Sequence, residues 1–164
     1  MDFGQFYNKY FQRVHAYACY RCSGPQEADE LTSLIFEKLF KKYSSFNPEK
    51  ANIEVWLFSI AKNVVIDYYR WHKIRSFFSI TEYEEILSAP DDTALSAQKR
   101  EEQKLLFNAL AKLPQREREI LGLKYSQGFN NKEIAAVTGL TESNTGVIIM
   151  RAVKKLRNIL EGEI

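Results

Sequence analysis

Long apolar runs are scarce in this sequence. Its least polar stretches, such as GVIIM at 146–150, fall far short of the roughly 20 residues that a helix needs to cross a bilayer. The first ten residues, MDFGQFYNKY, contain no basic segment followed by an apolar core, so we expect no secretion signal. The sequence therefore predicts a protein that stays in the cytoplasm.

Motifs that carry catalytic chemistry are also missing. We find no phosphate-binding loop, no Ser-His-Asp arrangement and no pair of carboxylates in a plausible pocket; the adjacent acids Asp91 and Asp92 fall in an acidic segment. We therefore expect neither an enzyme nor a cofactor.

Cysteine and histidine are rare, with two of each, yet His15, Cys19 and Cys22 would share one face of a helix. An imidazole and two thiolates in that arrangement could bind zinc if a fourth ligand came from elsewhere, but His72 is the only other histidine. Free cysteines commonly pack as small buried hydrophobes, and a disulfide is not expected in the cytoplasm. We expect these residues to pack, with metal binding or thiol redox sensing as the alternative.

The composition is that of a packed globular protein, with 45% hydrophobic and 27% charged residues. The net charge of +2 is unevenly distributed: residues 1–73 carry 10 basic and 8 acidic side chains, residues 74–98 carry 1 and 5, and residues 99–164 carry 12 and 8. This pattern predicts two mildly basic modules, 1–75 and 98–164, joined by an acidic flexible linker over 76–97.

Hydrophobic residues recur at three- and four-residue steps, which predicts an all-α fold. Helices are expected from Phe3 to beyond Val14, over about 28–43, and over roughly 54–73, with a loop at 44–52. In the third helix we expect the packed face to include Leu57, Phe58 and Ile66. Helical patterning resumes at Gln98 and continues to the C-terminal end of the sequence.

The segment from Asn130 to Leu156 has helix-turn-helix spacing. Asn130 and Glu133 fit a capping box, Gly139 fits a left-handed turn residue, and Thr141 fits the cap of a second helix. This spacing favours DNA binding over an ordinary pair of antiparallel helices. The candidate residues for duplex contact are Glu142, Ser143, Asn144 and Gly146 toward the major groove, and Arg151, Lys154, Lys155 and Arg157 near phosphates. Lys132 and the capping residue Thr141 complete the candidate set.

A second candidate site lies at the end of the third helix, where YYRWHK at 68–73 mixes rings with cations. Single-stranded nucleic acid is bound by stacking on rings and by cations near its phosphates. For any one of these rings, the alternative is packing at the edge of the core.

Two long segments together resemble the extracytoplasmic-function (ECF) sigma factors of bacterial RNA polymerase. They are ADELTSLIFEKLFKKYSSFNPEKANIEVWLFSIAKNVVIDYYR and LAKLPQREREILGLKYSQGFNNKEIAAVTGLTESNTGVIIMRAVKKLR. The resemblance covers nearly the whole chain and implies two small helical domains, region 2 and region 4, which bind the −10 and −35 promoter elements. The alternative function is that of an autonomous helix-turn-helix transcriptional regulator.

The resemblance also implies partners and roles. The partners would be core RNA polymerase (the β′ coiled coil and the β subunit), promoter DNA and an anti-sigma factor. The residues that match polymerase-docking positions are Glu30, Leu31, Phe36 and Leu39. The residues that match positions near the −10 strand are Phe46 and Asn47 in a loop that captures a flipped base, Asn63 in its pocket, and Lys62, Tyr69, Arg70 and Lys73 around it.

The sequence departs from the family pattern at a few positions. Ser33 stands where the family usually has Gln, and Thr145 stands where a β-branched apolar residue usually packs the turn. Gly146, Val147 and Ile148 replace a Lys-Ser-Arg run, and the loss of these cations should weaken phosphate contacts and change the −35 preference. The promoter sequence, the regulon and the inducing signal therefore stay open.

Overall fold

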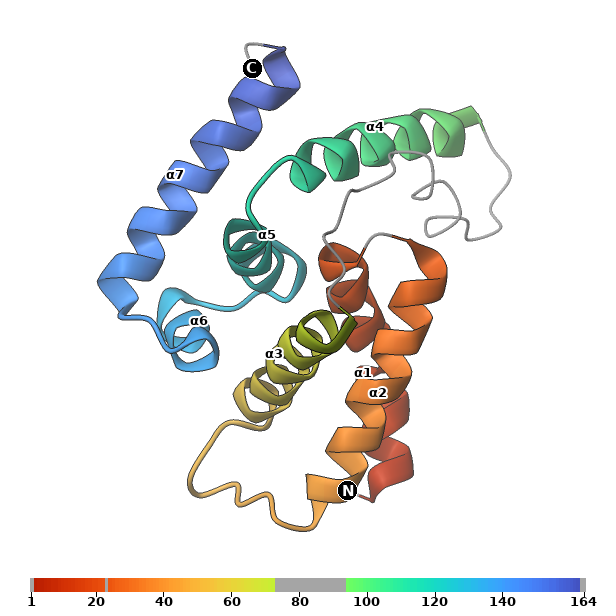
Figure 1. Cartoon of the computed structure of the whole chain (residues 1–164), viewed down its shortest axis with the longest axis vertical. Coiled ribbons are helices and arrows are strands. Elements are labelled where there is room, and N and C mark those ends of the chain that lie inside the picture. Colours follow the sequence, from red (N-terminus) through yellow and green to blue (C-terminus); the bar gives the residue numbers. More distant parts are fainter. Residues whose placement is uncertain (1, 23, 73–93, 163–164) are drawn as a thin grey trace.

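The computed structural model describes residues 2–22, 24–72 and 94–162, and every element in those ranges is helical (Figure 1). This confirms the all-α prediction. None of the helices in these ranges is both long enough and apolar enough to cross a bilayer. The elements are α1 (Phe3–Arg21), α2 (Pro25–Tyr43), α3 (Ile53–His72), α4 (Ala94–Ala111), α5 (Gln115–Leu121), the π-helix η2 (Gly122–Ser126), α6 (Asn131–Thr138) and α7 (Glu142–Glu161).

The N-terminal module, α1–α3, is a three-helix unit around an aromatic and aliphatic core. Asp2 starts α1 with a capping box, in which its side chain accepts from the Gln5 amide at 2.9 Å and the Gln5 side chain accepts from the Asp2 amide. Burying each large apolar side chain contributes about 1.5–3 kcal/mol. The fully buried members include Phe6, Val14, Leu31, Ile35, Leu39, Leu57 and Phe58.

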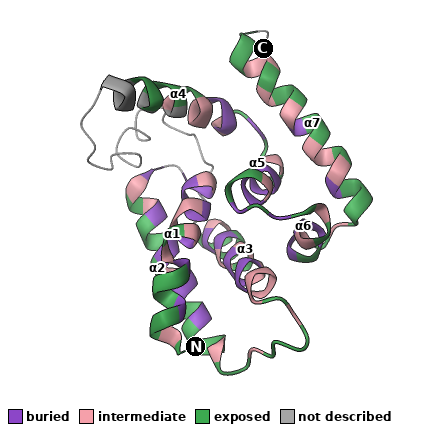
Figure 2. Cartoon of the chain, turned by 180° about the vertical axis from the view of Figure 1, so that it is seen from behind, coloured by how far each residue is buried: buried purple, intermediate pink, exposed green. Residues whose placement is uncertain are grey.

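The C-terminal module, α4–α7, has a smaller core of its own, formed by Leu110, Leu113, Leu121 and Ala152. The two modules are in contact, because α6 packs on α3 and α5 packs on α1 (Figures 1 and 2). Phe129, just before α6, meets Phe58 of α3 edge to face with ring centroids 5.4 Å apart. One apolar core therefore runs through both modules. The sequence-based prediction of two modules joined by a flexible linker did not include this contact.

Two details differ from the sequence-based expectation. Helix α4 begins at Ala94, so it includes the last four residues of the expected linker; residues 73–93, the rest of that linker and Lys73 included, lie outside the described residues. In α3, Ile66 is 40% exposed, and Val65 is buried in its place. The expected positions Leu57 and Phe58 are fully buried, so periodicity was wrong only at Ile66, because α3 has apolar residues on more than one side.

Candidate nucleic-acid interface

The helix-turn-helix geometry is present in detail. The Asn130 side chain accepts from the Glu133 amide at 2.9 Å, and the Glu133 carboxylate accepts from the Asn130 amide at the same distance. Gly139 ends α6 in the left-handed region at φ 76°, and Thr141 caps α7 by accepting from the Asn144 amide at 3.1 Å. These features fix the direction in which α7 leaves the turn.

Helix α7 is buried along one face and exposed along the opposite one. Thr145 and Ala152 are fully buried, and the Thr145 hydroxyl donates to the Thr141 carbonyl at 2.9 Å, so a polar residue packs this turn without an unpaired group. The exposed candidates on α7 and around it are Lys132, Thr141, Glu142, Ser143, Asn144, Arg151 and Lys154, with Gly146 half-buried. Lys155 differs from these, because its ammonium pairs with Glu117 at 2.6 Å within the module.

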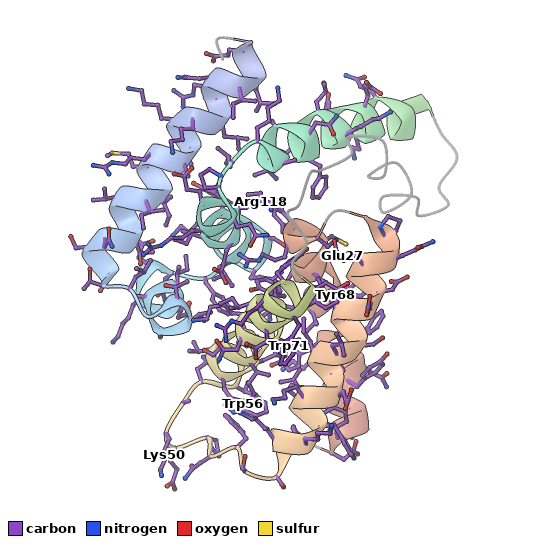
Figure 3. The ribbon with its side chains drawn as sticks, in the orientation of Figure 1. Glu27, Lys50, Trp56, Tyr68, Trp71 and Arg118 are labelled. Atoms are coloured by element: carbon purple, nitrogen blue, oxygen red, sulfur yellow. The ribbon has the colours of Figure 1, made fainter. Side chains whose placement is uncertain are left out.

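A groove of about 400 Å³ runs between α2 and α3 in the N-terminal module. Its apolar floor is Leu34, Ile60 and Val64. Asn63 lines it, and so does Trp71, whose side chain is 82% exposed (Figure 3). Its charged lining residues are Glu37, Lys38, Lys41, Lys42 and Asp67. An aromatic ring, an amide and several ammonium groups therefore meet in one hollow.

The ring cluster at the end of α3 is divided, because Tyr68 and Trp71 line the groove whereas Tyr69 contacts α1. The Tyr68 hydroxyl donates to Glu30 at 3.0 Å and the Tyr69 hydroxyl donates to the Arg21 carbonyl at 2.8 Å, so both rings pack against neighbouring helices. Burial raises the pKa of Tyr68 to about 12, with Glu30 adding to the shift, and burial likewise raises the pKa of Tyr69. Tyr69 is half-buried and its hydroxyl is held by α1, so its role at the promoter strand stays a prediction.

The remaining −10 candidates fall on different sides of α3. Lys62 is half-buried and, by its spacing, shares the face of Phe58 and Tyr69, which meets the rest of the protein. Asn63 and Arg70 are exposed, and Arg70 pairs with Asp67 at 3.7 Å. Of these candidates Asn63 lines the groove, and Arg70 pairs with a residue, Asp67, that also lines it.

The loop before α3 has its own internal contacts. Phe46 packs on Trp56 with ring centroids 5.0 Å apart. The exposed Asn47 accepts from the Glu49 amide at 2.8 Å, and Asn52 accepts from the Glu54 amide at 2.8 Å at the start of α3. The loop is thus shaped by short-range side-chain caps, which leave Asn47 on the outside.

The polymerase-docking candidates on α2 divide into a buried and an exposed group. Leu31 and Leu39 are fully buried and Phe36 is 5% exposed, so these three residues hold α2 in the core. Glu30 is exposed and accepts the hydrogen bond from Tyr68. The sequence pattern located the helix correctly, but it could not separate its inner from its outer face.

Polar contacts between the modules were not anticipated from the sequence. The Arg21 guanidinium lies 3.3 Å from Glu119 of α5 and donates to the Gln115 carbonyl at 3.1 Å, and the Tyr17 hydroxyl donates to Glu119 at 3.0 Å. Burial, followed by the Glu119 charge, raises the pKa of Tyr17. The labels Arg118, on α5 of the C-terminal module, and Glu27, on α2 of the N-terminal module, locate this contact in Figure 3.

The cysteines are packed. His15 Nδ1 lies 3.7 Å from Cys19 Sγ while its Nε2 lies 3.1 Å from Asp29, and both thiols are buried. Among the described residues no group of three metal-ligand side chains is placed to hold an ion. Burial raises the pKa of each thiol to about 12, which keeps it protonated and poorly reactive at neutral pH. These observations support the packing interpretation.

An all-helical protein with a helix-turn-helix module is thus defined by its geometry. Comparison with known proteins makes the class specific: the sigma-70 region 2 model matches residues 6–74 and a sigma-70 region 4 model matches residues 103–156. Over 161 residues the chain is 28% identical to the ECF RNA polymerase sigma factor BldN of Streptomyces coelicolor, covering 96% of this chain and 60% of that protein. Its identity to the ECF sigma factor SigM of Bacillus subtilis is 25%, covering 96% and 94%.

The fold agrees with solved structures. The sigma factor RpoE of Bartonella quintana, solved in complex with the anti-sigma factor NepR, superimposes with a TM-score of 0.79 at 23% identity, covering 98% of this chain and 97% of that one. CnrH, solved with the cytosolic domain of CnrY, gives 0.70 at 24% identity, covering 99% and 89%.

The chain belongs to the ECF group of the sigma-70 family, the RNA polymerase sigma factors that direct promoter-specific transcription initiation. Sigma factors are non-enzymatic, so family membership confirms that expectation. The match at 6–74 accounts for α1–α3, which an autonomous helix-turn-helix regulator would leave unexplained.

Proposed function

We propose that α7 reads the −35 element as duplex DNA, that the loop before α3 and the α2–α3 groove bind the melted −10 strand, and that α2 docks on the β′ coiled coil of core polymerase, with a further contact to the β subunit. The protein acts in the cytoplasm. Its regulation involves an anti-sigma factor, a partner of the kind present with RpoE of Bartonella quintana.

The observation that carries the −35 assignment is the charge of α7. Between Glu142 and Glu161 this helix has no acidic residue, and it has four basic ones. Of these, Arg151 and Lys154 are exposed and, unlike Lys155, form no ion pair with any residue that the structure describes. A helix that leaves a fixed turn with such a face suits the major groove, with its first residues at the bases and its cations at phosphates.

The −10 assignment is supported by the groove rather than by the whole ring cluster. Trp71 offers an exposed ring for stacking, and Asn63 offers an amide that can pair with a base edge. Lys42 lines the same groove and can contact phosphates, as can Lys41, which pairs with Glu37. Trp71 therefore joins the candidate set, while Tyr69 supports the helix from within. Phe46 and Asn47 lie in the loop that follows α2 in the chain, where Asn47 is exposed.

In the proposed docking to polymerase, the residues of α2 have two different roles. Leu31, Phe36 and Leu39 anchor the helix in the core, and Glu30 presents a carboxylate on the outside. A helix held so firmly is a preformed docking surface, which lowers the entropic cost of association.

The test is in vitro transcription with purified core polymerase on fragmented genomic DNA. Discrete start sites that depend on this chain are expected, and the sequences upstream of them define both elements. Replacing Arg151 and Lys154 together with Ala should abolish −35 dependence, whereas Lys112→Ala, an exposed change in the turn after α4, should not. Duplex binding without polymerase, and no transcripts, would contradict the proposal.

A further inference from the structure

The outward face of α7 carries apolar side chains where a purely electrostatic DNA contact would need none. Ser143, Val147, Met150 and Lys154 follow one another at steps of four, three and four residues, so they form a single stripe along the helix. This stripe lies opposite the buried Thr145 and Ala152. Val147 is 37% exposed and Met150 is 67% exposed.

From this stripe we infer that Val147 and Met150 read the 5-methyl groups of thymines in the −35 element. The inference rests on the proposed role of α7 and adds a specificity mechanism to it. In the major groove the thymine methyl is the one apolar group that a base pair presents, and apolar side chains recognise it by contact. Ser143, one turn before Val147, provides a hydroxyl that can pair with either type of base pair.

The charge around this stripe favours DNA over a protein as its binding partner. Arg151 and Lys154 border the two apolar residues, and no acidic side chain occurs on α7 between Glu142 and Glu161. Met150 and Lys154 also line a hollow of about 510 Å³ beside Tyr125, so apolar and cationic groups are adjacent. A polyanion with methyl groups in its groove matches both properties, whereas a typical apolar protein interface is poor in charge at its centre.

The experiment uses holoenzyme assembled from core polymerase and the full chain. A promoter found by in vitro transcription is randomised at its upstream element, and DNA that the holoenzyme binds is selected. Each thymine of the selected element is then replaced singly by deoxyuridine, which removes only the methyl group. We expect one or two positions at which this change weakens binding about three- to fivefold, the effect of one buried methyl group.

The side chains are tested by the same replacement. In Val147→Ser or Met150→Gln holoenzyme, binding to the thymine form should weaken and the difference between thymine and uracil should vanish at the matching position. Leu160→Ser is the matched control, because Leu160 is another exposed apolar residue of α7, 50% exposed and near its C-terminal end. This variant should keep the full discrimination.

The outcomes separate this inference from the proposed function. If no thymine is selected, or uracil is tolerated everywhere, while removal of Arg151 and Lys154 still abolishes −35 dependence, the methyl contact is wrong and the role of α7 stands. If neither the upstream sequence nor these cations affect binding, both are wrong. If Val147→Ser impairs holoenzyme assembly and leaves discrimination intact, the stripe is a protein contact and the inference is overturned.

Discussion

Arg21 of α1 and Glu119 of α5 form a buried ion pair at 3.3 Å across the contact between the two modules. The side chains are only 4% and 9% exposed, and Tyr17 donates to the second carboxylate oxygen at 3.0 Å. Removing one partner leaves the other charge buried without compensation, which costs far more than the pair itself contributes.

Neutralising Glu119 should therefore destabilise the docked arrangement. For Glu119→Gln we expect the free energy of unfolding to fall by about 3–5 kcal/mol, the usual cost of breaking a buried pair. Urea unfolding of the full chain measures this loss. The control Glu101→Gln removes an exposed carboxylate of α4 and should change stability little.

A double-mutant cycle makes this prediction sharper. Arg21→Met combined with Glu119→Gln should cost clearly less than the sum of the two single changes, because neither charge is then left alone. Strict additivity, or a Glu119→Gln effect no larger than that of Glu101→Gln, would contradict a coupled pair across the modules.

The features that the sequence predicted well depend on short-range geometry. Asn130, Glu133 and Gly139 are fixed by hydrogen bonds and backbone angles within a few residues of each other, so their spacing is sufficient. Local spacing was insufficient for Ile66, which is 40% exposed, because a helix with apolar residues on several sides needs its tertiary partners to decide which face is buried.

The contact between the modules was beyond sequence reasoning for a related reason. Arg13 donates to both oxygens of Glu54 at 2.6 and 3.1 Å and to the Gln127 carbonyl at 3.2 Å, yet no local pattern joins these residues. The charge distribution indicated two basic modules and an acidic connection, which says nothing about how two such modules pack. Separate modules and docked modules have the same composition.

Replacement by alanine should affect stability differently at two glycines of the helix-turn-helix. Gly139 is left-handed at φ 76° and its Cβ would have no neighbour within 4 Å, so Gly139→Ala should cost about 1–2 kcal/mol through the backbone alone. Gly146 is inside α7 with ordinary space for a Cβ, 3.4 Å from the Asn131 side-chain nitrogen, so Gly146→Ala should be neutral or stabilise by up to about 1 kcal/mol. Thermal unfolding of both variants measures the difference. Equal losses of stability would show that the left-handed backbone at Gly139 is not what makes alanine unfavourable there.

The buried cysteines predict slow chemistry in the folded protein. Because burial raises the pKa of Cys19 and Cys22 from 9.0 to about 12, both thiols should alkylate with iodoacetamide at pH 8 at least tenfold more slowly in the folded chain than in urea. A raised thiol pKa means that the native state holds its proton more tightly. The associated stability is complete below pH 9 and is lost as the pH rises toward 12.

Mass spectrometry of the alkylated peptides separates the two thiols, and Cys19→Ser isolates the reaction of Cys22. Equal rates for folded and unfolded protein would show that the thiols are accessible and would restore redox sensing as an interpretation. Stoichiometric zinc in protein purified without added metal would restore the metal interpretation instead.

The two rings Trp71 and Tyr69 should separate promoter binding from stability. Trp71 is 82% exposed, so Trp71→Ala should leave unfolding almost unchanged but lower the affinity of holoenzyme for single-stranded −10 DNA about fivefold or more, the effect of losing one stacked base. Tyr69→Phe removes a hydrogen bond to the Arg21 carbonyl and should cost about 0.5–1.5 kcal/mol of stability with −10 binding unchanged. Fluorescence of 2-aminopurine in the −10 strand and urea unfolding measure the two effects, and the reverse assignment would place the nucleic-acid face on the other side of α3.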